Sequence, residues 1–437
     1  MSQESEPTAA DNKLRILVVG GGIGGIALAR KLSQSPHFAV TIYERDEGPT
    51  TRDQGLVIGL RQEALDILLS KLEWPHLWNL FQSTGSATGL CLMNKASFAP
   101  MLIGQGFMTL QVGEDVKSSL IPRSSLRNEM MRGLDHTRVQ VVYGKQVLSY
   151  KETEDEVVVT TSDGISCSFD VLVGADGARS KIRNQRCPAL EPVEIGYWNN
   201  AGSILLTPEK AHSVAANLMV AYARNCLTRK PGKRGASFMS FVYTDHAGEH
   251  LLWSLSMPQA LADDFGLKSD LDKDEMLAAT IKFSQDCFPQ DITALFKLTD
   301  VSELFPGYKF YSVLPEVVAS NPLGQELHTR VTLIGDAAHK TTTQAGLGAT
   351  AALQDAILLA EHLERISGRS QVTRYVIANA LRQYEVKMSV NAKAVVGSSV
   401  ARTRDAHSTN TIQIAVANSI ISFMGYLLGF YYFVSGK

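Results

Sequence analysis

The chain has few cysteines and no excess of charge of either sign. Its five cysteines among 437 residues lie far apart, with no C-x-x-C pair and no spacing typical of a zinc site. This pattern predicts reduced thiols in a cytoplasmic protein, with no metal site and no redox disulfide to carry electrons. The formal net charge of −2 gives no electrostatic reason to expect a nucleic-acid partner, because such binding depends on concentrated lysine and arginine.

The two ends of the chain differ in apolar character. Residues 1–12 are polar and lack the apolar core of a signal peptide, so we expect a flexible tail. From Ala406 to Gly436 no Asp, Glu, Lys or Arg occurs, and the apolar run 412–434 exceeds the roughly 20 residues that a membrane-spanning helix needs. Polar side chains interrupt this run at Gln413, Asn418, Ser419 and Ser422. Two interpretations stay open, namely membrane association through 412–434 and a helix packed on the protein's own surface.

The length predicts two to three structural units. We expect a discontinuous nucleotide-binding domain over 13–80, 115–190 and 325–400, because glycine motifs and buried-strand patterns occur in these segments. Alternating strands such as "SFMSFVYT" predict a substrate domain over 81–114 and 191–324. The remaining 401–437 would form a C-terminal helical segment that ends in the apolar run.

A glycine cluster follows the first predicted strand, at 15–19, and opens a predicted helix over 24–34. Its pattern is Gly20-x-Gly22-x-x-Gly25, and a second strand over 39–46 contains Glu44. In such a βαβ unit the glycines allow a tight turn, close approach of a pyrophosphate and close helix packing. The acidic residue can accept hydrogen bonds from a ribose. This unit predicts binding of a dinucleotide, without choosing between NAD and FAD.

Two further motifs follow predicted strands. Asp176-Gly177, with Ser180 and Arg183, matches D-G-x-x-S-x-x-R, although taken by itself the pattern favours an Asp-Gly turn followed by a capped helix. Gly335-Asp336 ends a later strand, and the glycine-rich stretch 346–349 opens a long helix, which can present free backbone N–H groups to a ligand.

Together, the order and spacing of the three motifs resemble the group A flavoprotein monooxygenases, the family of p-hydroxybenzoate hydroxylase. The resemblance extends to about residue 400 and is loose in the central domain. It implies an α/β fold with a Rossmann-like FAD-binding domain of the p-hydroxybenzoate hydroxylase type, an inserted mixed-sheet substrate domain and C-terminal helices. It also implies FAD as the cofactor, with NAD(P)H as co-substrate.

The resemblance also implies which residues contact the cofactor. Glu44 and the first glycines would hold the ADP half, Asp336 the ribityl region, and the backbone at 346–349 the flavin ring, while the Asp176 element is linked to FAD and the reduced nicotinamide. The implied FAD contacts are Gly20, Gly22, Gly25, Glu44, Gly55, Arg123, Asp176, Asp336, Gly346, Gly348 and Ala349. No catalytic side chain is assigned, because the flavin carries the chemistry.

The sequence departs from the family in one loop. Where the family has prolines after "GDAAH", this chain has Lys340, Thr342 and Thr343, and Thr350 replaces a common asparagine. We interpret Lys340 as a solvated loop residue and His339 as a packed histidine. The departures leave the geometry of the loop beside the reactive ring open.

The resemblance implies an NAD(P)H- and O₂-dependent monooxygenase that hydroxylates or epoxidises a small, apolar substrate through a C4a-hydroperoxyflavin. The overall pattern is similar to fungal enzymes of secondary metabolism. Two alternatives remain at this point. One is a flavin-dependent reductase on the same fold, and the other is a non-catalytic binding protein similar to the GDP-dissociation inhibitors of Rab proteins.

Overall fold

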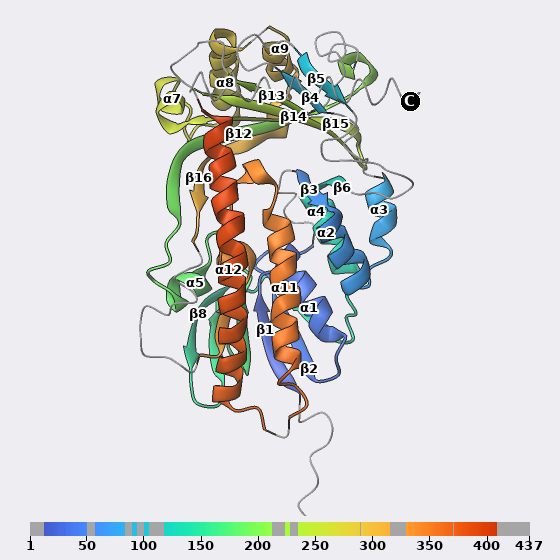
Figure 1. The fold of residues 1–437 in the computed structure, drawn as a ribbon, viewed down its shortest axis with the longest axis vertical. Coiled ribbons are helices and arrows are strands. Elements are labelled where there is room, and N and C mark those ends of the chain that lie inside the picture. The colour runs from blue at the N-terminus through green and yellow to red at the C-terminus, as the bar shows by residue number, and fades with distance from the viewer. Residues whose placement is uncertain are drawn as a thin grey trace, which may run out of the picture.

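The computed structural model gives the fold shown in Figure 1. It describes residues 13–49, 57–83, 90–93, 100–104, 118–211, 223–227, 235–288, 290–314, 329–369 and 371–408.

A five-stranded parallel sheet lies in the lower half of the molecule as drawn in Figure 1, with strand order β17-β11-β1-β2-β7. Its strands are β1 (Leu14–Val19), β2 (Phe38–Tyr43), β7 (Val139–Val142), β11 (Val171–Gly174) and β17 (Val331–Leu333). Ile16, Leu17 and Val18 are fully buried, as expected for a parallel sheet covered on both faces. The predicted β-strand–helix–β-strand unit therefore forms the centre of an α/β fold.

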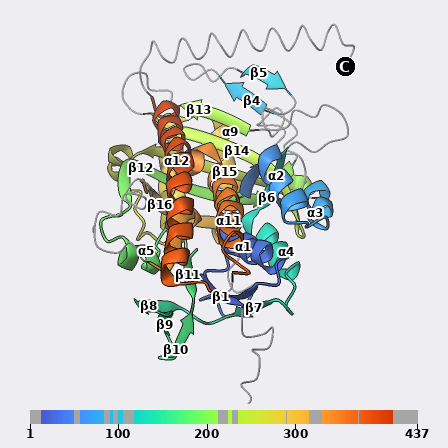
Figure 2. The same cartoon turned by 60° about the horizontal axis from the view of Figure 1, so that its bottom comes forward.

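Two long helices, α11 (Gly348–Glu364) and α12 (Arg374–Ala406), run side by side along this part of the molecule (Figures 1 and 2). The first helix, α1 (Ile23–Ser33), packs directly against α11. A Cβ added at Gly24 would lie 3.2 Å from the Cβ of Ala352, so the glycine permits this close approach. The other helices of this half are α2 (Gln62–Asp66), α3 (Leu77–Ser83), α4 (Arg123–Arg132) and α5 (Lys181–Arg186).

The helix that begins at Gln62 changes its type along its length. It is α-helical only to Asp66 and continues as a π-helix over Ile67–Lys71, where Leu72 N donates to Ile67 O at 2.9 Å. The wider turn accommodates one extra residue. Leu65, Leu68 and Leu72 nevertheless all stay buried.

A seven-stranded mixed sheet forms the upper half, in the order β16-β12-β15-β14-β13-β4-β5. Its strands are β4 (Leu90–Met93), β5 (Pro100–Gly104), β12 (Val193–Leu205), β13 (Ala223–Leu227), β14 (Ser237–Asp245), β15 (Gly248–Pro258) and β16 (Leu304–Ser312). Its helices are α7 (Gln259–Asp264), α8 (Lys273–Cys287) and α9 (Gln290–Leu298), with a 3-10 turn over Val301–Glu303. The predicted domain boundaries stay predictions, although the two large sheets draw their strands from the segments expected.

Alternate residues of the mixed sheet have different surroundings. Trp198 and its cross-strand partner Met257 belong to an apolar core that also contains Phe283 of α8. The neighbouring pair, Asn199 and Ser256, therefore points to the opposite face of the sheet. Two smaller sheets complete the fold: β8 (Val147–Glu152), β9 (Val157–Thr161) and β10 (Ser166–Phe169) form one, and β3 (Val57–Arg61) pairs with β6 (Ser118–Pro122).

The helix α12 is the last described element, and description ends at Ser408. Within the described residues, no helix combines the length and the apolar character that crossing a membrane requires. The apolar run 412–434 and the tail 1–12 lie outside the described residues, so membrane contact through 412–434 stays a prediction.

Candidate active site

A cavity of about 1190 Å³ lies between the two halves of the protein. It is larger than the roughly 300–1,000 Å³ typical of pockets for one small ligand. Its walls come from the start of α1, from α4, from the turn after β17, from the start of α11 and from strands β14–β16. The cavity therefore has room for a long cofactor together with a second molecule.

The glycine turn before α1 forms one end of this cavity. Gly20 has a φ of +111°, and a Cβ there would lie 2.5 Å from Ala175 O. Helix α1 has Gly22 as its N-cap with no side-chain cap and no acidic residue in its first turn. Gly22 and Gly25 line the cavity, so the open N–H groups of this helix start can meet an anionic group.

Glu44 and Arg127 hold this turn from behind. Gly21 N donates to Glu44 Oε2 at 2.8 Å, and Arg127 Nε donates to Gly21 O at 2.7 Å. Arg127 and Glu44 form a buried ion pair at 3.5 Å. Gly20 and Glu44 do not line the cavity, so the contact of Glu44 with a ribose stays a prediction. Arg127 belongs to none of the sequence motifs, although it lies one helical turn after Arg123.

The Asp176 element is a capped helix start beside the cavity. Asp176 Oδ2 accepts a hydrogen bond from Lys181 N at 2.8 Å, and Ser180 Oγ accepts one from Arg183 N at 2.8 Å. Burial raises the pKa of Asp176. Its Oδ1 is buried with no hydrogen-bond partner among the described residues, and Gly177 lines the cavity. The capped-helix interpretation is confirmed, while the contact of Asp176 with FAD stays a prediction.

Arg183 joins this element to the turn that follows β17. Its guanidinium donates to Ala178 O at 2.9 Å and to Ala337 O at 3.4 Å. That turn is a 3-10 helix over Gly335–Ala337, in which Gly335 has a φ of +58°.

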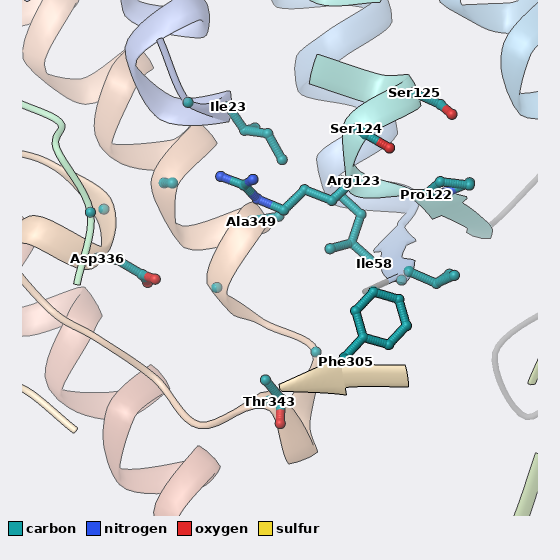
Figure 3. Close-up of a pocket in the computed structure, with 18 of the residues that line it drawn as sticks. Ile23, Ile58, Pro122, Arg123, Ser124, Ser125, Phe305, Asp336, Thr343 and Ala349 are labelled. Atoms are coloured by element: carbon teal, nitrogen blue, oxygen red, sulfur yellow. The ribbon is translucent and has the colours of Figure 1, made fainter. Parts of the chain in front are cut away.

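Asp336 extends from this turn into the cavity, and Arg123 of α4 enters it from the other side (Figure 3). The Asp336 side chain is exposed to the cavity, where desolvation by the surrounding protein raises its pKa against the positive charges of His339, Lys340 and Arg123. Burial likewise lowers the pKa of Arg123, against the charge of Asp336. The two side chains form a polar zone in the middle of the cavity.

A buried ion pair fixes the turn that carries Asp336. Asp355 Oδ2 accepts a hydrogen bond from Gly335 N at 2.8 Å and lies 2.5 Å from His339 Nε2. Burial alone lowers the pKa of His339, but the carboxylate of Asp355 raises it overall. His339 is 2% exposed and is thus a packed histidine, as the sequence predicts.

The start of α11 completes the cofactor side. Gly346 has a φ of +62°, and α11 begins at Gly348 with no side-chain cap. Gly346, Gly348 and Ala349 all line the cavity. Lys340 is not the solvated residue that the sequence suggested. It is half-buried, and its Nζ lies over the ring of Tyr311, 5.3 Å from the ring centroid.

The far end of the cavity lies against the mixed sheet. Tyr243, Asp245 and His250 line it. Ser203, which is not part of the lining, is in hydrogen-bonding contact with Tyr243 and His250. Ser203 Oγ lies 3.1 Å from Tyr243 Oη and 3.3 Å from His250 Nδ1, while His250 Nε2 lies 3.1 Å from Asp245 Oδ1. Ser203 is 1% exposed and does not line the cavity, so this group is a polar wall and not a nucleophilic triad.

The structure therefore brings most of the expected residues to one cavity. Those that line it are Gly22, Gly25, Arg123, Asp336, Gly346, Gly348 and Ala349. Gly20, Glu44 and Asp176 lie behind its wall, and Gly55 lies outside the described residues. Two helix starts without a side-chain cap, with the carboxylate of Asp336 between them, fit a dinucleotide with a polar linker.

Comparison with known proteins supports this interpretation. Residues 18–61 match the NAD(P)-binding Rossmann-like domain model. The chain is 27% identical to the FAD-dependent monooxygenase sor5 of Hypocrea jecorina, over 89% of this chain and 84% of that protein. It is 25% identical to salicylate hydroxylase of Pseudomonas putida, over 85% of this chain and 81% of that protein.

Solved structures share the fold. Klebsiella pneumoniae HpxO complexed with FAD and uric acid matches with a TM-score of 0.70 at 20% identity, over 94% of this chain and 92% of that one. These relatives identify the chain as an enzyme of the flavin-dependent monooxygenase class. Within that class, it is similar over most of its length to FAD-dependent monooxygenases of the p-hydroxybenzoate hydroxylase type.

Proposed function

We propose that this protein binds FAD along the cavity and uses NAD(P)H and O₂ to oxygenate a small organic substrate. The observation that carries the proposal is the continuity of the cavity from the start of α1, past Asp336, to strands β14–β16. The backbone at Gly22–Gly25 would hold the pyrophosphate, and Asp336 would accept hydrogen bonds from the hydroxyl groups of the linker.

When bound and reduced, the flavin activates O₂ for transfer of one oxygen atom to the substrate. In the hydroxylation that we propose, a substrate C–H bond becomes C–OH while NAD(P)H is oxidised. The second oxygen atom, two electrons from NAD(P)H and two protons give water. The chain's own residues bind, orient and exclude solvent, and the start of α11 with the loop before it forms the wall between cofactor and substrate.

We propose a ring compound with at least one hydrogen-bonding substituent as the substrate class. Tyr243, His250, Phe305 and Tyr308 line the cavity on the side of the mixed sheet, together with the polar side chains of Asp245 and His246. Aromatic side chains pack against planar ligands, while Tyr and His also supply hydrogen bonds. Two of the proteins named above are salicylate hydroxylase and HpxO with bound uric acid, and both compounds are of this kind. This substrate is more polar than the sequence alone suggests.

The first test is a substrate screen with purified protein. We expect yellow protein whose consumption of NAD(P)H and O₂ rises together, in a ratio of about one to one, when a ring compound that becomes oxygenated is added. Mass spectrometry of the product with ¹⁸O₂ should show one labelled oxygen atom. Substrate reduction at the expense of NAD(P)H without O₂ uptake would favour the reductase. Colourless protein that does not take up FAD would favour the non-catalytic binding protein.

A further inference from the structure

The loop between Asp336 and α11 lacks the prolines expected from the family, yet it is firmly held by other means. Thr341, Thr342 and Thr343 line the cavity, so the position of this loop shapes the space where cofactor and substrate would meet. The φ torsion of a threonine can take a wider range of values, whereas proline fixes φ near −65°. What replaces the prolines is visible in the contacts of Thr342.

Thr342 is bound to two residues near the end of α12. Its N–H donates to Ser399 Oγ at 3.3 Å, and its Oγ1 donates to Ser399 O at 3.0 Å. Its Oγ1 also lies 2.8 Å from Thr403 Oγ1. Ser399 and Thr403 are both 0% exposed, and the two lie one helical turn apart. Hydrogen bonds of this kind in a dry environment hold geometry tightly, because solvent does not compete for the groups.

A second contact holds the loop from the sheet side. Gln344 Nε2 donates to Ser256 Oγ of β15 at 2.8 Å. Ser256 Oγ lies 2.9 Å from His407 Nε2, and His407 Nδ1 lies 2.5 Å from Thr403 O. The ring of His407 packs on Tyr197 of β12, with centroids 4.6 Å apart. The end of α12 thus contacts the loop and the mixed sheet together.

We propose that Ser399 and Thr403 form a clamp that positions the loop of Thr341–Ala345 and takes over the role of the missing prolines. The clamp acts through Thr342 and touches neither cofactor nor substrate, so its two members are positioning residues. The proposal rests on the proposed function, because its expected consequence is that NAD(P)H oxidation stays coupled to oxygenation of the substrate. A loop held in place keeps water from the reaction zone, and a displaced loop diverts reducing equivalents to hydrogen peroxide.

The backbone of Thr342 supplies a sharp test. Its φ of −77° and ψ of 157° already fall in the range of proline. The substitution Thr342→Pro should therefore fit the backbone while removing every hydrogen bond of Thr342 to α12. If the clamp replaces proline, then Thr342→Pro should compensate for its loss.

The experiment compares four forms of the holoenzyme with NAD(P)H, O₂ and the best compound from the substrate screen. Ser399→Ala/Thr403→Val removes both clamp hydroxyls, whereas Thr403→Ser keeps both and removes only a methyl group. We expect the double variant to release about five- to tenfold more peroxide per NAD(P)H, the factor expected from one or two lost hydrogen bonds. Thr403→Ser should stay near wild type, and adding Thr342→Pro to the double variant should restore coupling.

Ser398→Ala is the matched control, because Ser398 Oγ donates only within α12, to Val395 O at 3.0 Å. Visible circular dichroism of bound FAD serves as a readout that does not depend on turnover. It should change in the double variant and return with Thr342→Pro. Unchanged dichroism and coupling in the double variant, or a fall in melting temperature alone, would overturn the clamp. Failure of the proposed function would instead show as wild-type protein that binds no FAD or oxygenates no compound.

Discussion

At the scale of single residues, Asp336 and Lys340 lie only four positions apart but face different surroundings. Asp336 lines the cavity, whereas Lys340 packs over Tyr311 outside the lining. We predict that Asp336→Ala weakens FAD binding by about tenfold or more, since hydrogen bonds to a charged group contribute roughly 1.5–3 kcal/mol. Lys340→Ala should retain FAD within about twofold. Fluorescence titration of apoprotein with FAD measures both affinities, and equal affinity in the two variants would refute the role of Asp336.

Some residues of the site were predictable from sequence motifs, and others were not. The glycines, Arg123 and Asp336 are identifiable because a motif of fixed spacing contains them. Arg127, which binds Gly21 and Glu44, and Asp355, which binds Gly335 and His339, support those motifs from behind. Their partners are 106 and 20 positions away in the chain, so local spacing carries no sign of them. Only the packing of α4 and α11 brings these groups together.

At the scale of elements, α12 carries a buried acid whose ionisation opposes folding. Glu385 lies 3.8 Å from Arg186 and accepts a hydrogen bond from Thr332 Oγ1 at 2.8 Å. Burial outweighs these partners and raises the pKa of Glu385 from 4.5 to about 7. The folded state therefore binds this proton more tightly than the unfolded state.

Because the pKa of Glu385 is higher in the folded state, its contribution to stability falls as the pH rises. The stabilising contribution of protonated Glu385 is complete below the unfolded pKa of 4.5 and is lost as the pH rises through about 7. A shift of this size corresponds to roughly 3 kcal/mol. We predict that Glu385→Gln, which stays neutral, loses less stability than wild type between pH 5 and about 8. Urea unfolding across that range measures the difference, and parallel curves for the two proteins would contradict it.

At the scale of the whole molecule, α12 links the two halves through one very close contact. A Cβ added at Gly235, before β14, would lie 2.1 Å from His407 O. We predict that Gly235→Ala separates α12 from the mixed sheet and lowers stability by about 1–3 kcal/mol. Gly397→Ala is the control, because nothing lies within 4 Å of a Cβ at this exposed helical position. That change should be neutral or stabilising by about 0.5–1 kcal/mol. If Gly235→Ala melts at the same temperature as wild type, Gly235 is not a position of close contact.

The general architecture was predictable from the sequence, because buried-strand patterns and glycine turns are local signals. The strands at 15–19 and 39–46 and the strand before Asp336 were predictable in this way, whereas the order of the five strands in the parallel sheet was not. The attachment of Thr342 to Ser399 and Thr403 was not predictable, since 57 and 61 positions separate these residues. The loop was recognised as unusual by its missing prolines, but its anchor depends on where α12 ends.

The alternation in the mixed sheet has a consequence for how such an enzyme changes over evolutionary time. Along β12 and β15, residues such as Trp198 and Met257 build the core, whereas Asn199 and Ser256 point away from it. On β14 and β15 the face opposite this core carries Tyr243 and His250, which line the cavity. Changes at these two positions can therefore alter which compound is accepted while the packing against α8 and α9 stays in place. Substitutions on the cavity face of the sheet can change the substrate, while the residues on the core face maintain the fold. Relatives with only 22–27% identity that keep the same cofactor chemistry are the expected product of that freedom.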